Sequence, residues 1–247
     1  MHEDEKRAIR RLPLFRDAAA QTFAELMRSA TVQSVPPRRE LLRRGSRPDA
    51  LHVLMAGAVE LHADWNDNEA VMAVLRPVSS FTLAACIADL PCLMAARTLE
   101  PSRIVSIPAP ALCAAMAGDH GLSKAAMAEL AGSYRSMVRQ SMNLKLRNSR
   151  ERLAAWLLRQ SHGLDDSPSF LLPVEKRHLA SYLGMTPESL SRTLRQLQHS
   201  GVAVDGARVS ITDRDRLVAL ALPDPLMDDG HADEGGGEGG LPKRRPA

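Results

Sequence analysis

Hydrophobic and polar positions follow different periods along the chain, and each period predicts a different kind of element. Near the start, apolar residues recur at helical spacing on both sides of Pro13: Ile9, Leu12, Leu14, Phe23, Leu26 and Met27. This spacing predicts helix over residues 5–30, with a break at the proline.

Between residues 32 and 110, short apolar runs separated by turn signals replace the helical period. The clearest run is residues 59–64, where Val, Leu and Ala alternate with Glu, His and Asp. This alternation is typical of a strand with one buried face and one solvated face. Several strands at such spacing predict an all-β sandwich or barrel of about 80 residues.

The helical period returns at residue 121 and continues without proline through residue 160. It predicts a long helix over residues 122–146 that bends or breaks near Asn148 and Ser149. One stripe of this helix carries mostly apolar side chains: Met127, Leu130, Tyr134, Met137, Val138 and Ser141. Because a helix of this length outruns the surface of one small domain, we interpret the stripe as a coiled-coil-like seam of a homodimer. Packing against the β-domain is the alternative.

The most specific pattern lies in the last third of the chain. Residues 174–183 predict a short helix, which a Gly-Met-Thr turn at 184–186 separates from a second helix over residues 187–200. Gly201 is a typical residue at the end of such a helix. Asp-Gly at residues 205–206, between two apolar runs, predicts a β-hairpin. Elements in this order form a winged helix-turn-helix.

The second helix of this pattern has two different faces. Leu190, Leu194 and Leu197 fall on one side, toward a core. The start of the helix and its exposed side carry the candidate DNA-binding residues: Thr186, Glu188, Ser189, Ser191, Arg192 and Arg195. Arg can bind guanine with two hydrogen bonds, Glu can accept one from a base amino group, and Ser can do either. Such a stripe alone is often a solvated helix face, but the turn, cap, core face and hairpin in order favour base recognition.

The block Leu179-Ala-Ser-Tyr-Leu-Gly-Met-Thr-Pro-Glu-Ser-Leu-Ser-Arg192, with the hairpin that follows, resembles the DNA-binding domain of the cyclic-AMP receptor/fumarate-nitrate regulator (Crp/Fnr) superfamily. Residues 185–192 are similar to its nitric-oxide and denitrification regulators. The resemblance implies a homodimer whose two recognition helices enter successive major grooves of a near-palindromic double-stranded DNA. By matching positions, Glu188, Ser191 and Arg192 would recognise a TTGAT-like half-site, and RNA polymerase is a further candidate partner.

Upstream segments resemble other parts of the same family. The segments similar to its β-roll sensor domain are residues 14–16, 41–45 and 53–59, and residues 150–154 resemble its junction after the dimerisation helix. The fold class implied is α+β, with an N-terminal cupin-like jelly roll and a C-terminal winged helix-turn-helix. The expected segments are a β-roll sensor domain at 1–120, a dimerisation helix at 121–147, a winged helix-turn-helix at 148–221 and a disordered tail at 222–247.

The chain departs from the family where cyclic nucleotides bind. In place of the family's Gly-Glu and Arg-Ser pairs it has Phe-Thr-Leu-Ala at residues 81–84 and Cys-Leu at residues 92–93. A cyclic phosphate there would be buried without a counter-charge, so we expect no tight binding of cyclic AMP. The candidate effector pocket that remains is formed by Leu83, Ile87, Cys92, Leu93, Met94 and Arg97, of which Arg97 is displaced from the family's position.

Three alternatives for the signal stay open. The first is haem, with candidate axial ligands His2, His52, His62, His120, Cys86, Cys92 and Met94. The second is redox sensing, although Cys86 and Cys92 are more typical of small buried apolar residues. The third is a degenerate sensor in a protein controlled by its abundance. The family's amino-terminal cysteine cluster is missing, so we expect no iron–sulfur cluster.

The charge distribution supports an anionic partner. Residues 223–247 hold six acidic residues and six of the 15 glycines, which predicts disorder. The rest of the chain is more basic than the net charge of +3 indicates. Residues 134–152 contain six Lys or Arg and one acid, and this run could contact phosphates or be a solvated helix face.

Composition and motifs exclude several classes of protein. Three cysteines without a Cys-x-x-Cys pair favour neither a disulfide framework nor a metal site. No secretory signal and no membrane-spanning run is recognisable, so a cytoplasmic location is expected. We find no G-x-S-x-G, G-x-x-x-x-G-K or H-E-x-x-H motif, and therefore expect no enzyme and no catalytic residue. The main alternative to a transcription factor is a ligand-binding regulatory protein whose winged helix docks on a protein partner.

Overall fold

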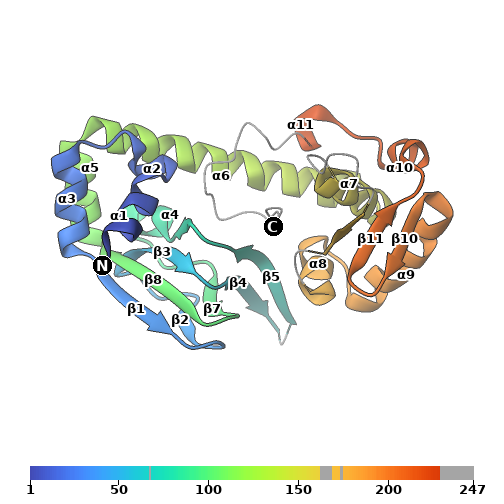
Figure 1. Cartoon of the computed structure of the whole chain (residues 1–247), viewed down its shortest axis with the longest axis horizontal. Helices are drawn as coiled ribbons and strands as arrows, with labels where there is room; N and C mark the ends of the chain where they lie inside the picture. Colours follow the sequence, from blue (N-terminus) through green and yellow to red (C-terminus); the bar gives the residue numbers. More distant parts are fainter. Residues whose placement is uncertain (67, 162–168, 173–174, 229–247) are drawn as a thin grey trace. The chain divides into compact units, whose positions relative to one another are not determined.

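A computed structural model describes residues 1–66, 68–161, 169–172 and 175–228. Over the described residues, the chain divides into two compact units, the first from Met1 to Arg135 and the second from Ser136 to Asp228. The boundary falls inside the longest helix, α6 (His120–Leu146) (Figure 1). The predicted dimerisation helix is therefore shared by the two units.

The first unit contains two four-stranded antiparallel sheets and a group of helices. Before α6 its elements are α1 (Glu3–Arg10), α2 (Pro13–Arg16), α3 (Ala20–Ser29), β1 (Thr31–Val35), β2 (Glu40–Leu42), β3 (Ala50–Ala56), β4 (Val59–Trp65), β5 (Asn68–Leu75), β6 (Ser79–Phe81), α4 (Leu83–Ala88), β7 (Ala95–Thr98), β8 (Ser102–Pro108) and α5 (Ala109–Gly118). The strand orders are β1-β8-β3-β6 and β2-β7-β4-β5. The predicted β-roll is confirmed, and the predicted N-terminal helix is three helices, with a second break at residues 17–19.

Two hydrophobic clusters lie on opposite faces of the β1-β8-β3-β6 sheet. Because successive side chains of a strand point to opposite faces, Val53 and Leu54 of β3 belong to different clusters. The cluster of Leu54 draws residues from both sheets and forms the interior of the roll. The cluster of Val53 includes side chains from α1 to α5 and from the start of α6. The helices thus cover one sheet of the roll.

Strand β4 corrects the prediction that its polar positions face solvent. Glu60 is completely buried, because its carboxylate pairs with Arg97, its neighbour in register on β7. Arg97 also donates two hydrogen bonds to Glu69 on β5, at 2.9 and 2.6 Å. An ion-pair cluster therefore joins β7, β4 and β5 on the polar side of this sheet.

The second unit is a helical domain with a small antiparallel sheet. After the last turns of α6 its elements are α7 (Ser149–Ser161), β9 (Ser169–Leu171), α8 (Lys176–Tyr182), α9 (Pro187–Leu197), the 3₁₀ helix η1 (Gln198–Ser200), β10 (Val202–Asp205), β11 (Arg208–Ile211), α10 (Arg214–Ala221) and α11 (Pro225–Asp228). The strand order is β10-β11-β9. Two helices, a turn and a hairpin follow in the predicted order, and the break near Asn148 is confirmed.

The start of the predicted tail is structured. Residues 225–228 form α11, and the side chain of Asp228 is 8% exposed and ion-paired. The prediction of disorder from residue 222 is therefore wrong for these first residues, and residues 229–247 lie outside the described part of the chain. Each helix described here is too short or too polar to cross a lipid bilayer.

Candidate nucleic-acid interface

The α8–α9 turn is built from the residue types that the sequence predicts for it. Gly184 has a φ of +63°, and a Cβ atom there would lie 2.6 Å from a side-chain carbon of Leu144. Glycine therefore meets both the backbone and the space requirements of the turn. Thr186 precedes α9 and accepts a hydrogen bond from the backbone N–H of Ser189 at 3.2 Å, with Pro187 at the first helical position.

The inner face of α9 is anchored in the core of the second unit. Leu190, Leu194 and Leu197 are 0%, 4% and 0% exposed and belong to the cluster that contains Trp156. Thr193 is also buried, and its hydroxyl donates to the backbone oxygen of Ser189 at 2.8 Å. This packing orients the opposite face of the helix.

The outer face of α9 presents the predicted recognition residues. Glu188, Arg192 and Arg195 are exposed, and Ser191 is half-buried. Arg195 Nε donates to the backbone oxygen of Ser191 at 3.4 Å, so its guanidinium lies along the helix. Hydrogen bonds from its own backbone N–H and from the Thr186 hydroxyl hold the pKa of Glu188 below its usual value. At neutral pH this face therefore carries two cations and one charged acceptor.

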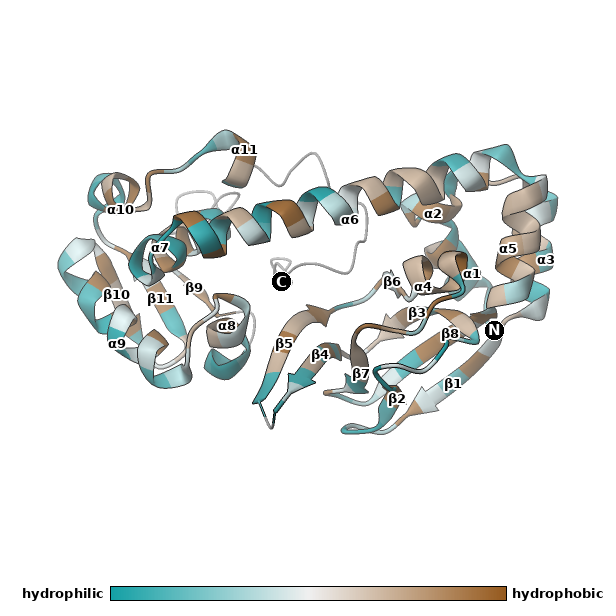
Figure 2. Cartoon of the chain, turned by 180° about the vertical axis from the view of Figure 1, so that it is seen from behind, coloured by the Kyte–Doolittle hydropathy of each residue, from teal (hydrophilic) through white to brown (hydrophobic). Residues whose placement is uncertain are grey.

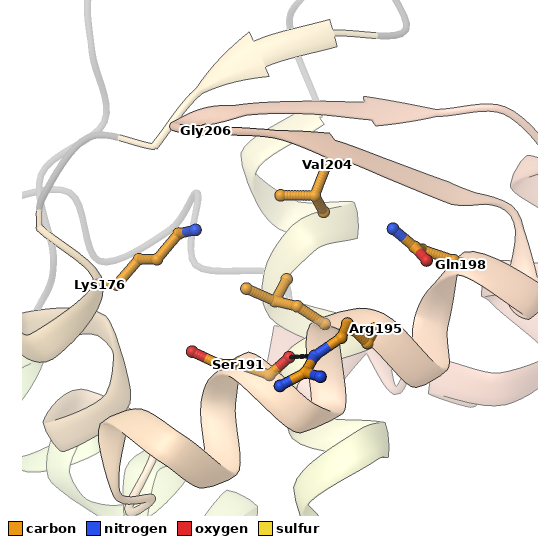
Figure 3. Close-up of a pocket in the computed structure, with 7 residues that line it drawn as sticks. Lys176, Ser191, Arg195, Gln198, Val204 and Gly206 are labelled. Atoms are coloured by element: carbon orange, nitrogen blue, oxygen red, sulfur yellow. Dashed lines mark hydrogen bonds between the residues drawn. The ribbon is translucent and has the colours of Figure 1, made fainter.

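A cleft of about 220 Å³ separates α9 from the β10–β11 hairpin (Figure 3). Its lining residues are Lys176, Ser191, Leu194, Arg195, Gln198, Val204 and Gly206. In Figure 3 the side chain of Lys176, from the start of α8, points toward the space between α9 and the hairpin. Gly206 has a φ of +57° and open space around it at the tip of the hairpin.

The sequence does not predict Lys176 and Gln198 as residues that line this cleft. Each lies at the end of a helix, outside the exposed stripe of α9. A basic residue at the first position of the first helix was the available signal for Lys176. For Gln198 there was none, because its position depends on how the hairpin folds back over η1.

The predicted effector-pocket residues lie in several different surroundings in the first unit. Leu93 is 82% exposed, whereas Leu83 packs with Ile87 in the cluster under the helices. Met94 packs against the interior of the roll, and Arg97 pairs with Glu60 and Glu69 on the sheet. Cys92 is buried, and its backbone pairs with that of residues 45 and 46. Leu83 and Ile87 lie on α4, Cys92 to Met94 lie in the segment between α4 and β7, and Arg97 lies on β7.

Two of the candidate haem ligands, His52 and Cys86, lie in different surroundings. His52 is buried on β3, where its ring lies 5.1 Å from that of Phe81 and its Nδ1 lies 2.9 Å from Ser106 Oγ. Burial lowers the pKa of His52. Cys86 lies on α4 in the cluster beneath the helices. Over the described residues, three or more His, Cys, Asp or Glu side chains are nowhere grouped as a metal site would need.

Most of the predicted dimer seam is exposed on α6. Met127, Tyr134 and Met137 are 60%, 68% and 68% exposed, and Val138 and Ser141 are also exposed. Figure 2 shows hydrophobic positions recurring along α6 among hydrophilic ones. Leu130 differs, because it packs against the core of its own unit. The stripe is thus a largely unpartnered apolar face within the single chain.

Two family models match the chain, one over each unit. The cyclic nucleotide-binding domain matches residues 32–119, and the Crp-like helix-turn-helix domain matches residues 151–220. The fumarate and nitrate reduction regulatory protein of Salmonella typhimurium is 32% identical over 131 residues, which are 51% of this chain and 52% of that protein. The chain thus matches about half the length of this curated relative.

Solved structures share the fold. FixK2 from Bradyrhizobium japonicum has a TM-score of 0.66 at 23% identity, over 79% of this chain and 98% of that chain. The c-di-GMP responsive global regulator CLP of Xanthomonas campestris has a TM-score of 0.66 at 19% identity, over 79% and 100%. Unit by unit, the architecture combines a cyclic-nucleotide-binding-type roll with a winged helix-turn-helix. With both domain models matched in this order, the chain belongs to the Crp/Fnr family.

Proposed function

We propose that the protein is a sequence-specific transcription regulator that binds a near-palindromic DNA site as a homodimer in the cytoplasm. The observation that carries this proposal is the exposed face of α9, where Glu188, Arg192 and Arg195 point away from a leucine-anchored core. A helix whose outer face and first turn are exposed in this way suits the major groove of DNA.

The residues of the interface divide into two roles. Arg192 and Arg195 can each donate two hydrogen bonds to guanine. Glu188 and Ser191 can accept hydrogen bonds from base amino groups. Lys176 and Gln198, beside the hairpin, suit the DNA backbone, where contacts position the protein without distinguishing sequence. A TTGAT-like half-site, carried over from the family resemblance, is the sequence that this set would recognise.

The exposed stripe of α6 supports dimerisation. Tyr134, Met137 and Val138 leave apolar area on a helix that a second copy can cover. If two α6 helices, one from each copy, pair along this stripe, the two recognition helices would contact half-sites about one turn of DNA apart. RNA polymerase is the partner through which a bound dimer would act on transcription.

The signal that we propose is not a cyclic nucleotide. Phe81 is 1% exposed inside the roll, and Thr82 binds the backbone oxygen of Ala50 through its hydroxyl at 2.8 Å. The side chains at these positions are apolar or neutral, and Arg97 is already paired with two carboxylates. Titration calorimetry with cyclic AMP should therefore give no heat of binding. Haem stays a prediction, which a Soret band in the protein from its native host would confirm.

The test of the proposed function is fluorescence anisotropy with DNA that contains an inverted repeat of the half-site. Wild-type protein should bind it at least about 1,000-fold more tightly than unrelated DNA, and Arg192→Ala should lose about 1–3 kcal/mol of that discrimination. Lys176→Ala should weaken binding to all sequences alike. It should also reduce the slope of the logarithm of affinity against the logarithm of salt concentration by about one. If the winged helix instead docks on a protein, wild type will not distinguish the two DNAs.

A further inference from the structure

The residues that follow the winged helix-turn-helix hold the junction between α6 and α7. Arg147 lies between the end of α6 at Leu146 and the start of α7 at Ser149, and its side chain is only 5% exposed. Its guanidinium donates two hydrogen bonds to the carboxylate of Asp228, at 2.8 and 2.6 Å. Arg147 therefore ties the junction to the last residue of α11.

Asp228 also binds a second guanidinium, which comes from α7. Arg159 Nη1 lies 3.0 Å from Asp228 Oδ1, and the backbone N–H of Asp224 donates to Oδ2 at 2.8 Å. Burial alone would raise the pKa of Asp228. The hydrogen bonds from Arg147 and from the backbone of Asp224, together with the nearby positive charges, outweigh this effect, so the pKa lies below its usual value. The cluster is therefore intact at neutral pH.

Further hydrogen bonds extend this cluster in both directions. Arg139 Nε, on α6, donates to the backbone oxygen of Leu226 on α11 at 2.9 Å. Arg152, on α7, donates to the backbone oxygen of Arg147 at 2.5 Å and to that of Leu183 at 2.9 Å. Leu183 lies in the turn that leads to α9. Contacts thus run from α11 through the junction to the turn before the recognition helix.

A buried ion pair of this kind contributes more to geometry than to net stability. Desolvation offsets much of the attraction between the charges, whereas the two parallel hydrogen bonds between Arg147 and Asp228 are satisfied in one relative orientation only. The carboxylate belongs to a segment 81 residues further along the chain than the junction it holds. The cluster therefore selects one angle between α7 and the adjoining turns of α6.

We propose that Asp228 is a positioning residue for DNA recognition. By holding Arg147 and Arg159 together, it fixes the direction in which α7 and the winged helix-turn-helix leave the dimerisation helix, and so the separation of the two recognition helices in a dimer. This inference rests on the proposed function. A dimer with a looser junction reaches more half-site separations but binds the preferred one less tightly, because binding must then order the junction.

The test uses the full-length protein and inverted repeats whose spacer changes by one base pair at a time, together with DNA that holds one half-site. Asp228→Asn should bind the preferred spacing about tenfold more weakly and show a flatter dependence on spacer length. Its affinity for the single half-site should stay within about twofold of wild type. Asp215→Asn removes the same charge from an exposed position on α10 and should keep the wild-type profile.

A second variant guards against misfolding of the first. Arg159→Gln leaves the bidentate pair with Arg147 in place and should flatten the spacer profile in the same direction, by about threefold. Circular dichroism and sedimentation establish that each variant is a folded dimer. Wild-type spacer profiles for both variants overturn the inference, and so does an equal loss on the single half-site. If wild type itself shows no sequence preference, the proposed function fails instead.

Discussion

Thr186 Oγ1 accepts a hydrogen bond from the backbone N–H of Ser189, three residues further on, at the start of α9. This bond satisfies one of the N–H groups that an α-helix leaves unpaired at its first turn. Thr186→Ala should therefore lower the free energy of unfolding of the second unit by about 1 kcal/mol.

The matched control for this cap is Thr186→Ser, which keeps the oxygen and should cost at most about 0.3 kcal/mol. Urea unfolding followed by the fluorescence of buried Trp156 measures both, in a Trp65→Phe background that removes the exposed tryptophan. Equal stability of the Ala and Ser variants would show that the bond does not stabilise the helix.

The leucine face of α9 should matter more to stability than the cap does. Leu190→Ala removes a completely buried side chain and should cost about 2–5 kcal/mol. Gln196→Ala, at an exposed position of the same helix, should change stability by about 0.5 kcal/mol or less. The same fluorescence assay compares them, and a cost below that of Thr186→Ala would contradict the buried packing.

The free energy of unfolding of the first unit should decrease at low pH, in part because Glu5 becomes protonated. The hydrogen bond from Arg103, with help from the backbone N–H of His2, lowers the pKa of Glu5 from 4.5 to about 2. A carboxyl with a depressed pKa stabilises the folded state above its unfolded value and loses this contribution as the pH falls toward the folded one. The stability difference between wild type and Glu5→Gln should therefore be full above pH 4.5 and vanish near pH 2.

Urea unfolding of the two proteins at a series of pH values measures this difference, and other titrating groups cancel in the comparison. A difference that stays constant from pH 7 to pH 2 would mean that the Glu5–Arg103 pair does not form in solution.

The apolar stripe of α6 should mediate self-association. Val138→Asp places a charge in the proposed seam and should convert dimer to monomer at micromolar concentration, because an unpaired charge would be buried. Ala128→Asp adds the same charge about 80° away around the helix and should leave the dimer intact. Sedimentation equilibrium separates the outcomes. Two variants that both stay dimeric would place the interface elsewhere.

The sequence predicts the recognition element well because its signals are local. The glycine turn, the Thr186 cap, the Leu190 face and the Asp-Gly hairpin follow one another along the chain, and residue type and spacing alone indicate each of them. The same holds for Gly201, which follows η1, adopts a φ of +83° and leaves only 2.3 Å between a Cβ atom and a backbone oxygen of Asp213.

Features that depend on distant partners are missed. Alternation along β4 predicts which way Glu60 points, but its burial depends on Arg97, which lies 37 residues further on. Composition predicts disorder from residue 222, yet Asp228 is held by Arg147 and Arg159 through contacts that no local pattern encodes. The apolar character of Leu93 likewise predicts a pocket where the chain exposes it instead.

Selection of bound sequences from a random DNA library tests base recognition by α9 most directly. Wild-type protein should enrich an inverted repeat. Arg192→Ala should lose the sequence preference at one base pair of each half-site and keep it at the other positions. Enrichment of no shared motif by the wild type, or an unchanged motif with Arg192→Ala, would contradict the assignment.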